Sequence, residues 1–91
     1  MGITVYASSV SGNKEMKKQQ QRITMVLDGK GIAYTVIDIS ASEEDKKTMR
    51  DLVGDPKALP PQIFNGDVHC GDFAAFDLAV EDGKINEFLK L

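Results

Sequence analysis

The pattern of apolar and polar positions predicts two strands joined by a helix in the first half of the chain. Residues 3–6 are short, β-branched and aromatic, and residues 33–39 are almost continuously apolar, which is typical of strands. The continuous apolar content of the second segment favours a strand that is covered on both faces. Residues 14–28 lie between them and place Ile23 and Leu27 on one face of a helix whose first half is nearly all polar.

The second half of the chain predicts another helix, a hairpin and two further helices. Ser42 precedes three acidic residues, which is typical of a helix N-terminus, and this helix would end at Gly54. Two short apolar segments flank Asn65-Gly66, which is a strong hairpin signal because both residues tolerate a positive φ angle. Asp72 is placed to cap a third helix, and Gly83 separates that helix from a short last one.

The resulting order of elements is β-α-β-α-β-β-α-α, which indicates the α/β fold class. Two strands joined by a helix form a right-handed parallel unit, and the hairpin adds an antiparallel pair. We therefore predict a four-stranded mixed sheet with helices on both faces, in a single domain that spans residues 1–91.

Composition narrows the classes of function. Lys and Arg number 11 against 14 Asp and Glu, which gives a net charge of −3 and argues against nucleic acid as a partner, because phosphate binding needs clustered positive charge. The single cysteine excludes an intramolecular disulfide, a dithiol centre and a zinc site built from cysteines. No apolar run approaches the ~20 residues that span a bilayer, and the first residues do not resemble a signal peptide. We expect a cytosolic chain with no metal site and no membrane contact.

The stretch Leu59-Pro60-Pro61-Gln62-Ile63-Phe64 directly precedes the predicted hairpin. Together with the order of elements, it resembles the thioredoxin fold in its small glutaredoxin form. This resemblance implies that Pro61 is a cis-proline at the start of the third strand, a position where proline removes no hydrogen bond from the sheet.

The whole chain is similar to the SH3-domain-binding glutamic-acid-rich-like proteins, a glutaredoxin-related family. The acidic tail for which the family is named is absent from these 91 residues. The resemblance implies a modulator of glutaredoxin activity in the cytosol and sometimes in the nucleus. The similar stretches run from end to end and are Val5-Tyr6 with the serine-rich loop to Gly12, Leu27-Asp28-Gly29-Lys30, Ile37-Asp38-Ile39-Ser40, Pro60-Pro61-Gln62-Ile63, Asn65-Gly66-Asp67, Cys70-Gly71-Asp72 and Glu87-Phe88-Leu89-Lys90-Leu91.

The redox motif of glutaredoxins is replaced in this chain. In glutaredoxins a Cys-x-x-Cys motif lies between the first strand and the first helix, and by resemblance it falls on Ser11-Gly12-Asn13-Lys14. A serine hydroxyl cannot form a disulfide, and iron–sulfur ligation needs the same missing thiolate. We therefore predict a redox-inactive loop, no catalytic residue and no cofactor.

Cys70 is a poor substitute for the missing thiol. It follows His69 on the predicted fourth strand, and neighbouring strand residues point to opposite faces of a sheet, so a Cys–His pair is not expected. We predict that Cys70 is a small buried apolar side chain.

Residual glutathione binding is an alternative to a purely non-catalytic role. Glutaredoxins hold glutathione beside the cis-proline and at the start of the third helix. In this chain the corresponding residues are Lys14, Pro60, Pro61, Gly71 and Asp72. Ala74 and Ala75 stand where glutaredoxins carry side chains that clasp the ligand. Weak glutathione binding, or a glutathione-dependent enzyme that uses the Ser11 hydroxyl, therefore stays open as the alternative.

Two segments are candidates for binding a protein partner. The first is a basic cluster on the first predicted helix, formed by Lys14, Lys17, Lys18 and Arg22. It would bind an acidic partner, and a solvated polar face is its alternative.

The second candidate is the segment from Pro60-Pro61 to Phe64, which matches the Pro-Pro-x-x-Phe pattern read by EVH1 domains. SH3 domains read prolines three residues apart in an exposed polyproline segment, and the chain lacks that spacing. A buried strand is the alternative for this segment. On balance the sequence predicts a monomeric, non-catalytic adaptor or modulator of glutaredoxins whose partners are other proteins.

Overall fold

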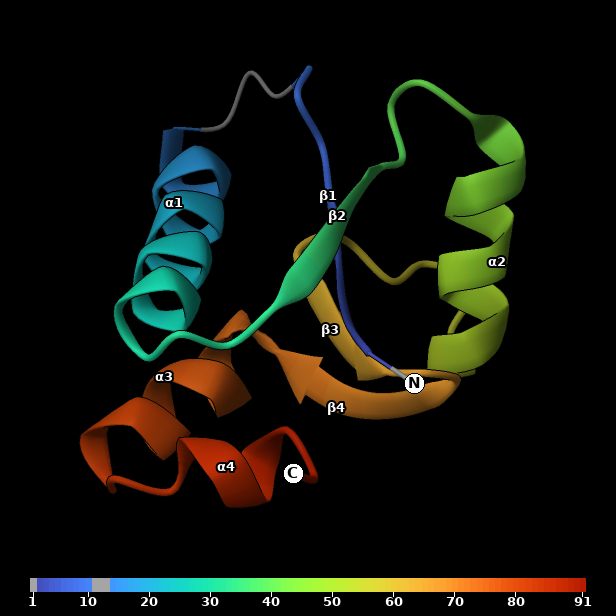
Figure 1. Cartoon of the computed structure of the whole chain (residues 1–91). Helices are drawn as coiled ribbons and strands as arrows, with labels where there is room; N and C mark the ends of the chain where they lie inside the picture. Colours follow the sequence, from blue (N-terminus) through green and yellow to red (C-terminus); the bar gives the residue numbers. More distant parts are fainter. Residues whose placement is uncertain (1, 11–13) are drawn as a thin grey trace.

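The strands and helices follow one another in the predicted order (Figure 1). The computed structural model describes residues 2–10 and 14–91. The elements in these ranges are β1 (Ile3–Ala7), α1 (Lys14–Gly29), β2 (Tyr34–Asp38), α2 (Glu43–Val53), β3 (Gln62–Asn65), β4 (Val68–Asp72), α3 (Phe73–Glu81) and α4 (Ile85–Phe88).

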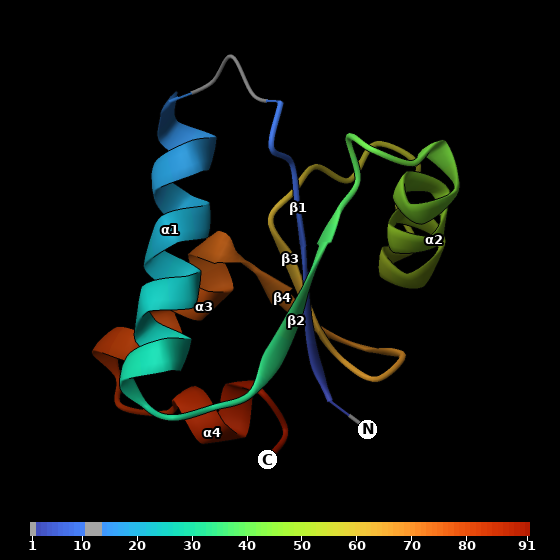
Figure 2. The same ribbon diagram turned by 45° about the horizontal axis from the view of Figure 1, so that its top comes forward.

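The strands form a mixed sheet in the order β2-β1-β3-β4. β1 is parallel to β2 and antiparallel to β3, and β3 and β4 form the hairpin. The right-handed parallel unit places α1 on one face of the sheet, and α2 covers the other (Figures 1 and 2). The predicted α/β class with a four-stranded mixed sheet is therefore confirmed.

Two apolar cores lie on the two faces of this sheet. On the face of α1, α3 and α4, buried side chains such as Val5, Leu27 and Phe76 pack together. On the face of α2, Met49 and Phe64 form the centre of a smaller core. Complete burial of one such side chain stabilises the fold by about 1.5–3 kcal/mol, so both faces contribute to holding the sheet in place.

Local signals explain where the helices begin and end. The Ser42 hydroxyl accepts a hydrogen bond from the Asp45 backbone N–H at 3.2 Å, and Gly54 ends α2 with a φ angle of 82°. A carboxylate oxygen of Asp72 accepts from the Ala75 N–H at 3.1 Å at the start of α3. These predicted caps are confirmed.

The hairpin is centred one residue later than predicted. Asn65 pairs with Val68 as the last residue of β3, so the turn residues are Gly66 and Asp67. Gly66 supplies the positive φ angle of 61° at the first turn position. The Asn65 side chain instead donates a hydrogen bond to the Leu89 carbonyl oxygen at 2.9 Å, which explains why it stays in the strand.

The predicted coverage of the second strand on both faces is wrong. β2 is an edge strand, and Val36 remains 47% exposed on the side of α1. α1 packs on Val5 of the neighbouring β1 through Ile23 and Leu27. An apolar run alone does not distinguish an edge strand from a central one, and here the helix does not extend over the edge.

Candidate functional site

The positions that replace the redox motif lie at the junction of β1 and α1. Ser11, Gly12 and Asn13 fall outside the described residues, so their role as a degenerate redox loop stays a prediction. Val10 and Lys14 border them on either side, and both are exposed.

A cavity of about 560 Å³ lies between α1, the segment before β3 and the start of α3. Of the residues predicted for glutathione binding, Pro60, Pro61 and Asp72 line this cavity. The Pro60–Pro61 peptide bond is cis, as the resemblance implies. Lys14 and Gly71 are not among the lining residues, so the structure brings together three of the five predicted positions.

Gly71 has a structural role instead. Its φ angle of 156° is one that side chains rarely adopt, and a Cβ atom at this position would lie 2.9 Å from Cε1 of Phe88. The glycine therefore allows α4 to pack against β4. Gly71 does not line this cavity, and its part in glutathione binding stays a prediction.

The polar side chains in the wall of this cavity bind one another. The Gln62 amide nitrogen donates to the Leu59 carbonyl oxygen at 2.8 Å, and its Oε1 atom lies 2.8 Å from Nε2 of His69. Gln62 is buried, and burial lowers the pKa of His69 below its ordinary value. At neutral pH the uncharged imidazole therefore donates from Nε2 to Gln62 and helps to fix the segment before β3.

Cys70 and His69 point to opposite faces of the sheet, as predicted. His69 lies 5.0 Å from the ring of Phe64 in the core beside α2, whereas Cys70 packs against the core beside α3 and α4. Cys70 is half-buried rather than fully buried, and burial raises the pKa of its thiol. The thiol is therefore a weak nucleophile at neutral pH.

A second cavity, of about 440 Å³, adjoins the first, shares Met16, Leu59 and Pro60 with it and was not predicted from the sequence. Val10 is 80% exposed and Leu59 is 62% exposed at its border. We call this region the loop-flanking surface, defined by Val10, Met16, Leu59, Lys46 and Arg50. The Arg50 side chain donates from Nε to the Ala58 carbonyl oxygen at 3.1 Å, which orients its guanidinium group. No sequence signal marks this surface, because its defining residues are single apolar or basic positions in four separate parts of the chain.

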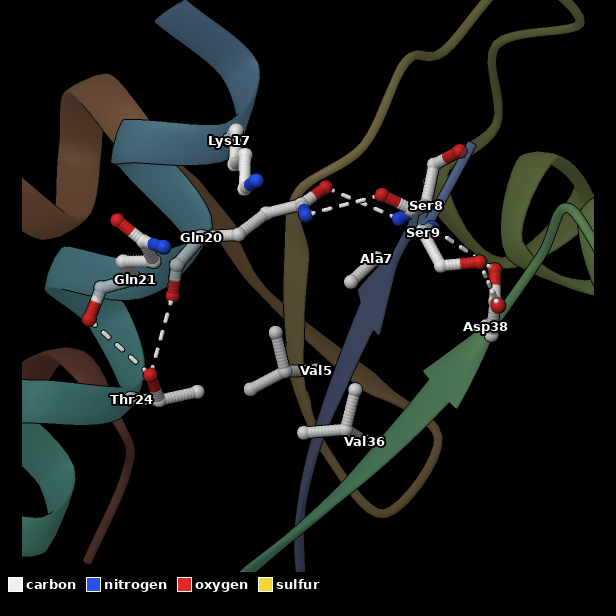
Figure 3. Close-up of a pocket in the computed structure, with 10 residues that line it drawn as sticks. All are labelled: Val5, Ala7, Ser8, Ser9, Lys17, Gln20, Gln21, Thr24, Val36 and Asp38. Carbon is white, nitrogen blue, oxygen red and sulfur yellow. Dashed lines mark hydrogen bonds between the residues drawn. The ribbon is translucent and has the colours of Figure 1, made fainter. Parts of the chain in front are cut away.

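The residues of the predicted basic cluster have different neighbours in the folded chain, and their role in binding an acidic partner stays a prediction. Lys14 and Lys18 are exposed on α1, whereas Arg22 forms an ion pair with Asp77 of α3 at 2.9 Å. Lys17 lines a separate groove between α1 and the edge of the sheet (Figure 3). An exposed ion pair contributes at most about 1 kcal/mol, so the Arg22 contact orients the side chain more than it stabilises the fold.

The proline-rich segment is not available as an extended ligand. Pro60, Pro61 and Phe64 are all buried, and Phe64 packs edge-on against Tyr6 with ring centres 5.2 Å apart. An EVH1 or SH3 domain binds an exposed polyproline helix. The structure therefore contradicts partner binding through these three residues and favours the buried-strand alternative.

Metal-binding clusters and membrane-spanning helices are both absent from residues 2–10 and 14–91. Within these ranges there is no group of three or more His, Cys, Asp or Glu side chains that could hold a metal ion. None of the helices described there has the length and apolar character needed to cross a membrane.

Comparison with known proteins gives a family match over the full length. A family model described as "SH3-binding, glutamic acid-rich protein" matches residues 1–91. A curated relative, the Drosophila melanogaster "SH3 domain-binding glutamic acid-rich protein homolog", is 46% identical over 103 residues. The alignment covers all of this chain and 65% of that relative, so the chain spans less than two thirds of the relative's length.

Solved structures place the fold among the glutaredoxins. The C. albicans actin interacting protein Aip5 matches with a TM-score of 0.78 and 22% identity, over 97% of this chain and 87% of that one. A buckwheat glutaredoxin–glutathione complex matches with a TM-score of 0.71 and 20% identity, over 98% of this chain and 76% of that one. These likenesses establish the thioredoxin/glutaredoxin-like fold.

Proposed function

This chain belongs to the SH3-binding, glutamic acid-rich protein family, and from that premise we propose that it is a non-catalytic module that binds other proteins through the loop-flanking surface. The observation that carries the proposal is the exposure of two large apolar side chains, Val10 and Leu59, on either side of a cavity next to the loop. The names of the family and of the Drosophila relative describe binding proteins, which supports the same class of function.

The loop-flanking surface has the chemistry of a protein interface. Exposed apolar side chains that gather at one place are typical of interaction sites, because a partner removes them from water. Lys46 and Arg50 border the apolar residues and outnumber the one acidic residue of the same lining, Glu43, and arginine is enriched in protein interfaces. A partner with an acidic rim around an apolar centre would therefore fit this surface.

The same surface is unsuited to thiol chemistry. The only cysteine in the chain, Cys70, lies in β4 and has a raised pKa, so it supplies little thiolate at neutral pH. By resemblance, Ser11 and Lys14 stand where glutaredoxins carry their two cysteines. We therefore propose that the fold is kept for binding and that thiol–disulfide exchange is lost.

SH3 domains and glutaredoxins are the two classes of partner to consider for this surface. An SH3 domain that bound this chain would have to use a surface other than the buried Pro60–Pro61 segment. A glutaredoxin is a second partner class, because binding next to its active site would change its activity. The name of the C. albicans neighbour describes interaction with actin, which is a precedent for protein binding by this fold. We propose that the chain is monomeric when free and acts in the cytosol and the nucleus.

Leu59→Asp tests the proposal directly. The variant places a charge in the centre of the loop-flanking surface, and Leu78→Asp is its matched control because Leu78 is 59% exposed on α3. Immobilised wild-type chain and both variants are compared by quantitative mass spectrometry of bound proteins from a cell lysate. The expected result is a set of proteins that is depleted at least tenfold on the Leu59 variant and retained on the control. Equal recovery on all three chains would contradict the proposal.

Weak glutathione binding is a second candidate, supported by the cavity of about 560 Å³ beside cis-Pro61. A two-dimensional amide NMR titration with reduced glutathione tests it. Shifts confined to Gln62, Asp72 and Ala74 at millimolar ligand would support binding in this cavity. Unchanged spectra would reject both this candidate and an enzyme that uses the Ser11 hydroxyl on glutathione.

A further inference from the structure

The outer edge of β2 has backbone groups without a partner strand. Among the described strands, only β1 pairs with β2. The Ile39 N–H donates to the Ala7 carbonyl oxygen at 2.8 Å, so Ile39 directs its backbone groups toward β1. Because these directions alternate along a strand, the N–H and C=O groups of Val36, three residues earlier, point away from β1. The backbone groups of Tyr34 point in the same direction as those of Val36, which leaves a short row of hydrogen-bond donors and acceptors at the edge.

The two edges of the sheet differ in how well they are protected. Natural edge strands usually avoid pairing with other chains by means of a proline, a lysine or a bulge. β4 has such an irregularity, since its register with β3 shifts between Ile63 and Phe64. β2 reads Tyr34-Thr35-Val36-Ile37-Asp38, with no proline, no lysine and an unbroken register. The edge of β2 is therefore the one suited to accept another strand.

An apolar groove of about 550 Å³ runs beside this edge (Figure 3). Val5 and Ala7 of β1 form its floor, and Val36 lies next to Val5 on the same face of the sheet. The groove faces Gln20 and Thr24 of α1, whose polar atoms are occupied. The Thr24 hydroxyl donates to the Gln21 carbonyl oxygen at 3.0 Å, and the Gln20 amide is bound to the backbone of Ser8. The groove thus offers an apolar side chain a place to enter.

The charged residues of the groove do not select a charged ligand. The Asp38 carboxylate accepts hydrogen bonds from the hydroxyl groups of Ser9 and Ser40, so its oxygen atoms are already occupied. Lys17 lies on α1 at the same groove and supplies a charge of opposite sign. The two charges offset each other, which favours an uncharged apolar side chain between them.

We infer that the edge of β2 and the adjacent groove bind an extended peptide segment of a partner protein as an additional strand. The peptide backbone pairs with the outward N–H and C=O groups of Val36. Side chains of a strand alternate between the two faces, so every second residue of the peptide would face the groove, and we expect an apolar residue next to Val36. A second copy of this chain is disfavoured as the occupant because each copy carries a net charge of −3.

The β2 edge contains none of the residues that define the loop-flanking surface, so peptide binding at this edge and partner binding at the loop-flanking surface can be tested independently. Val36→Lys introduces into β2 a lysine, the residue that commonly prevents edge strands from pairing with another chain. Val68→Lys is a matched control, because Val68 is 48% exposed on the other edge strand and Val36 is 47% exposed. Neither substitution affects Leu59 or Val10.

A displayed library of random seven-residue peptides is selected on the full chain, and the enriched peptides are synthesised and titrated by fluorescence anisotropy. We expect binding that weakens at least tenfold with Val36→Lys and less than twofold with Val68→Lys. Methylation of the peptide nitrogens whose N–H groups face β2 should abolish binding. Methylation of the alternate nitrogens, whose N–H groups face away from β2, should preserve it. The Val36 amide should also become protected from hydrogen exchange.

Three outcomes would overturn the inference. They are a selection that enriches no peptide, peptides that bind the Val36→Lys variant as tightly as the wild type, and peptides whose binding is unaffected by methylation of either set of nitrogens. The alternative occupant, a second copy of the chain, is tested by sedimentation of the free chain. Concentrations up to about 1 mM would reveal even a homodimer with a dissociation constant of about 1 mM. A dimer that Val36→Lys abolishes would assign the edge to a second copy and contradict the inference.

Discussion

The Gln20 side chain in α1 forms two hydrogen bonds with the backbone of Ser8 at the end of β1. Its Oε1 atom accepts from the Ser8 N–H at 2.9 Å, and its Nε2 atom donates to the Ser8 carbonyl oxygen at 3.1 Å (Figure 3). The contact joins the strand and the helix on either side of the loop. Val10 follows two residues after Ser8 and belongs to the loop-flanking surface.

Gln20→Ala should destabilise the fold by about 1–3 kcal/mol, because two backbone groups that are partly removed from water lose their partners. Gln21→Ala is the control, since Gln21 is exposed and its side chain is not used in this contact. Urea unfolding of both variants measures the difference in the free energy of unfolding. Equal stabilities would show that the Gln20 contact does not hold the end of β1.

Asp38→Asn should lower the stability of the chain at neutral pH and have less effect in acid. Hydrogen bonds from the hydroxyl and backbone N–H groups of Ser40 and Ser9 hold the pKa of Asp38 well below its ordinary value. A carboxyl group with a depressed pKa in the folded state stabilises the fold above its unfolded pKa of about 3.9, and this contribution is lost as the pH falls toward the folded value.

Melting temperatures at pH 7 and at about pH 2 check this expectation. The difference between the wild type and Asp38→Asn should shrink at the lower pH. Asp51→Asn, on the exposed side of α2, is the control and should show no such change. A difference between wild type and Asp38→Asn that is independent of pH would contradict the assignment.

Gly71→Ala should destabilise the chain by about 1–3 kcal/mol through backbone strain and contact with Phe88. Gly29→Ala is the matched control, because no described heavy atom lies within 4 Å of a Cβ atom at Gly29. That substitution should be neutral or stabilise the end of α1 by up to about 1 kcal/mol. Thermal or urea unfolding measures both, and a Gly71 variant as stable as the Gly29 variant would refute the packing of α4 described above.

His69 should titrate below its ordinary pKa of about 6.5, because burial disfavours the charged imidazolium form. Since the unfolded chain then binds the proton more readily, the contribution of His69 to stability is present above the unfolded pKa. It declines as the pH falls through the unfolded pKa toward the folded one. NMR titration of the imidazole proton measures the folded midpoint, and His69→Gln should remove the corresponding part of the pH dependence. A midpoint at or above the ordinary value would contradict this account of the Gln62 contact.

Local signals made much of the fold predictable. Ser42 and Asp72 cap their helices through residues three positions away, so their role can be predicted from a short stretch of sequence. The same holds for Gly54, whose positive φ angle ends α2. The resemblance to glutaredoxins, rather than any periodicity, indicated the cis bond before Pro61.

The features that were missed depend on contacts between distant segments. The exposure of Val36 depends on where α1 lies relative to the sheet edge, and the run of apolar residues around it contains no such information. Asn65 stays in β3 because its side chain donates a hydrogen bond to Leu89, 24 residues later. Likewise, Val10 and Leu59 become neighbours of one cavity only after the chain has folded.

We propose that the glutaredoxin-like fold of this chain serves binding rather than thiol–disulfide exchange. A glutathione-coupled disulfide reduction assay with the purified full chain tests this most directly. We expect no turnover above the blank that contains glutathione without protein, and the same result for Cys70→Ser. Turnover by the wild type that Cys70→Ser or Ser11→Ala abolishes would contradict the claim and identify the residue that performs the chemistry.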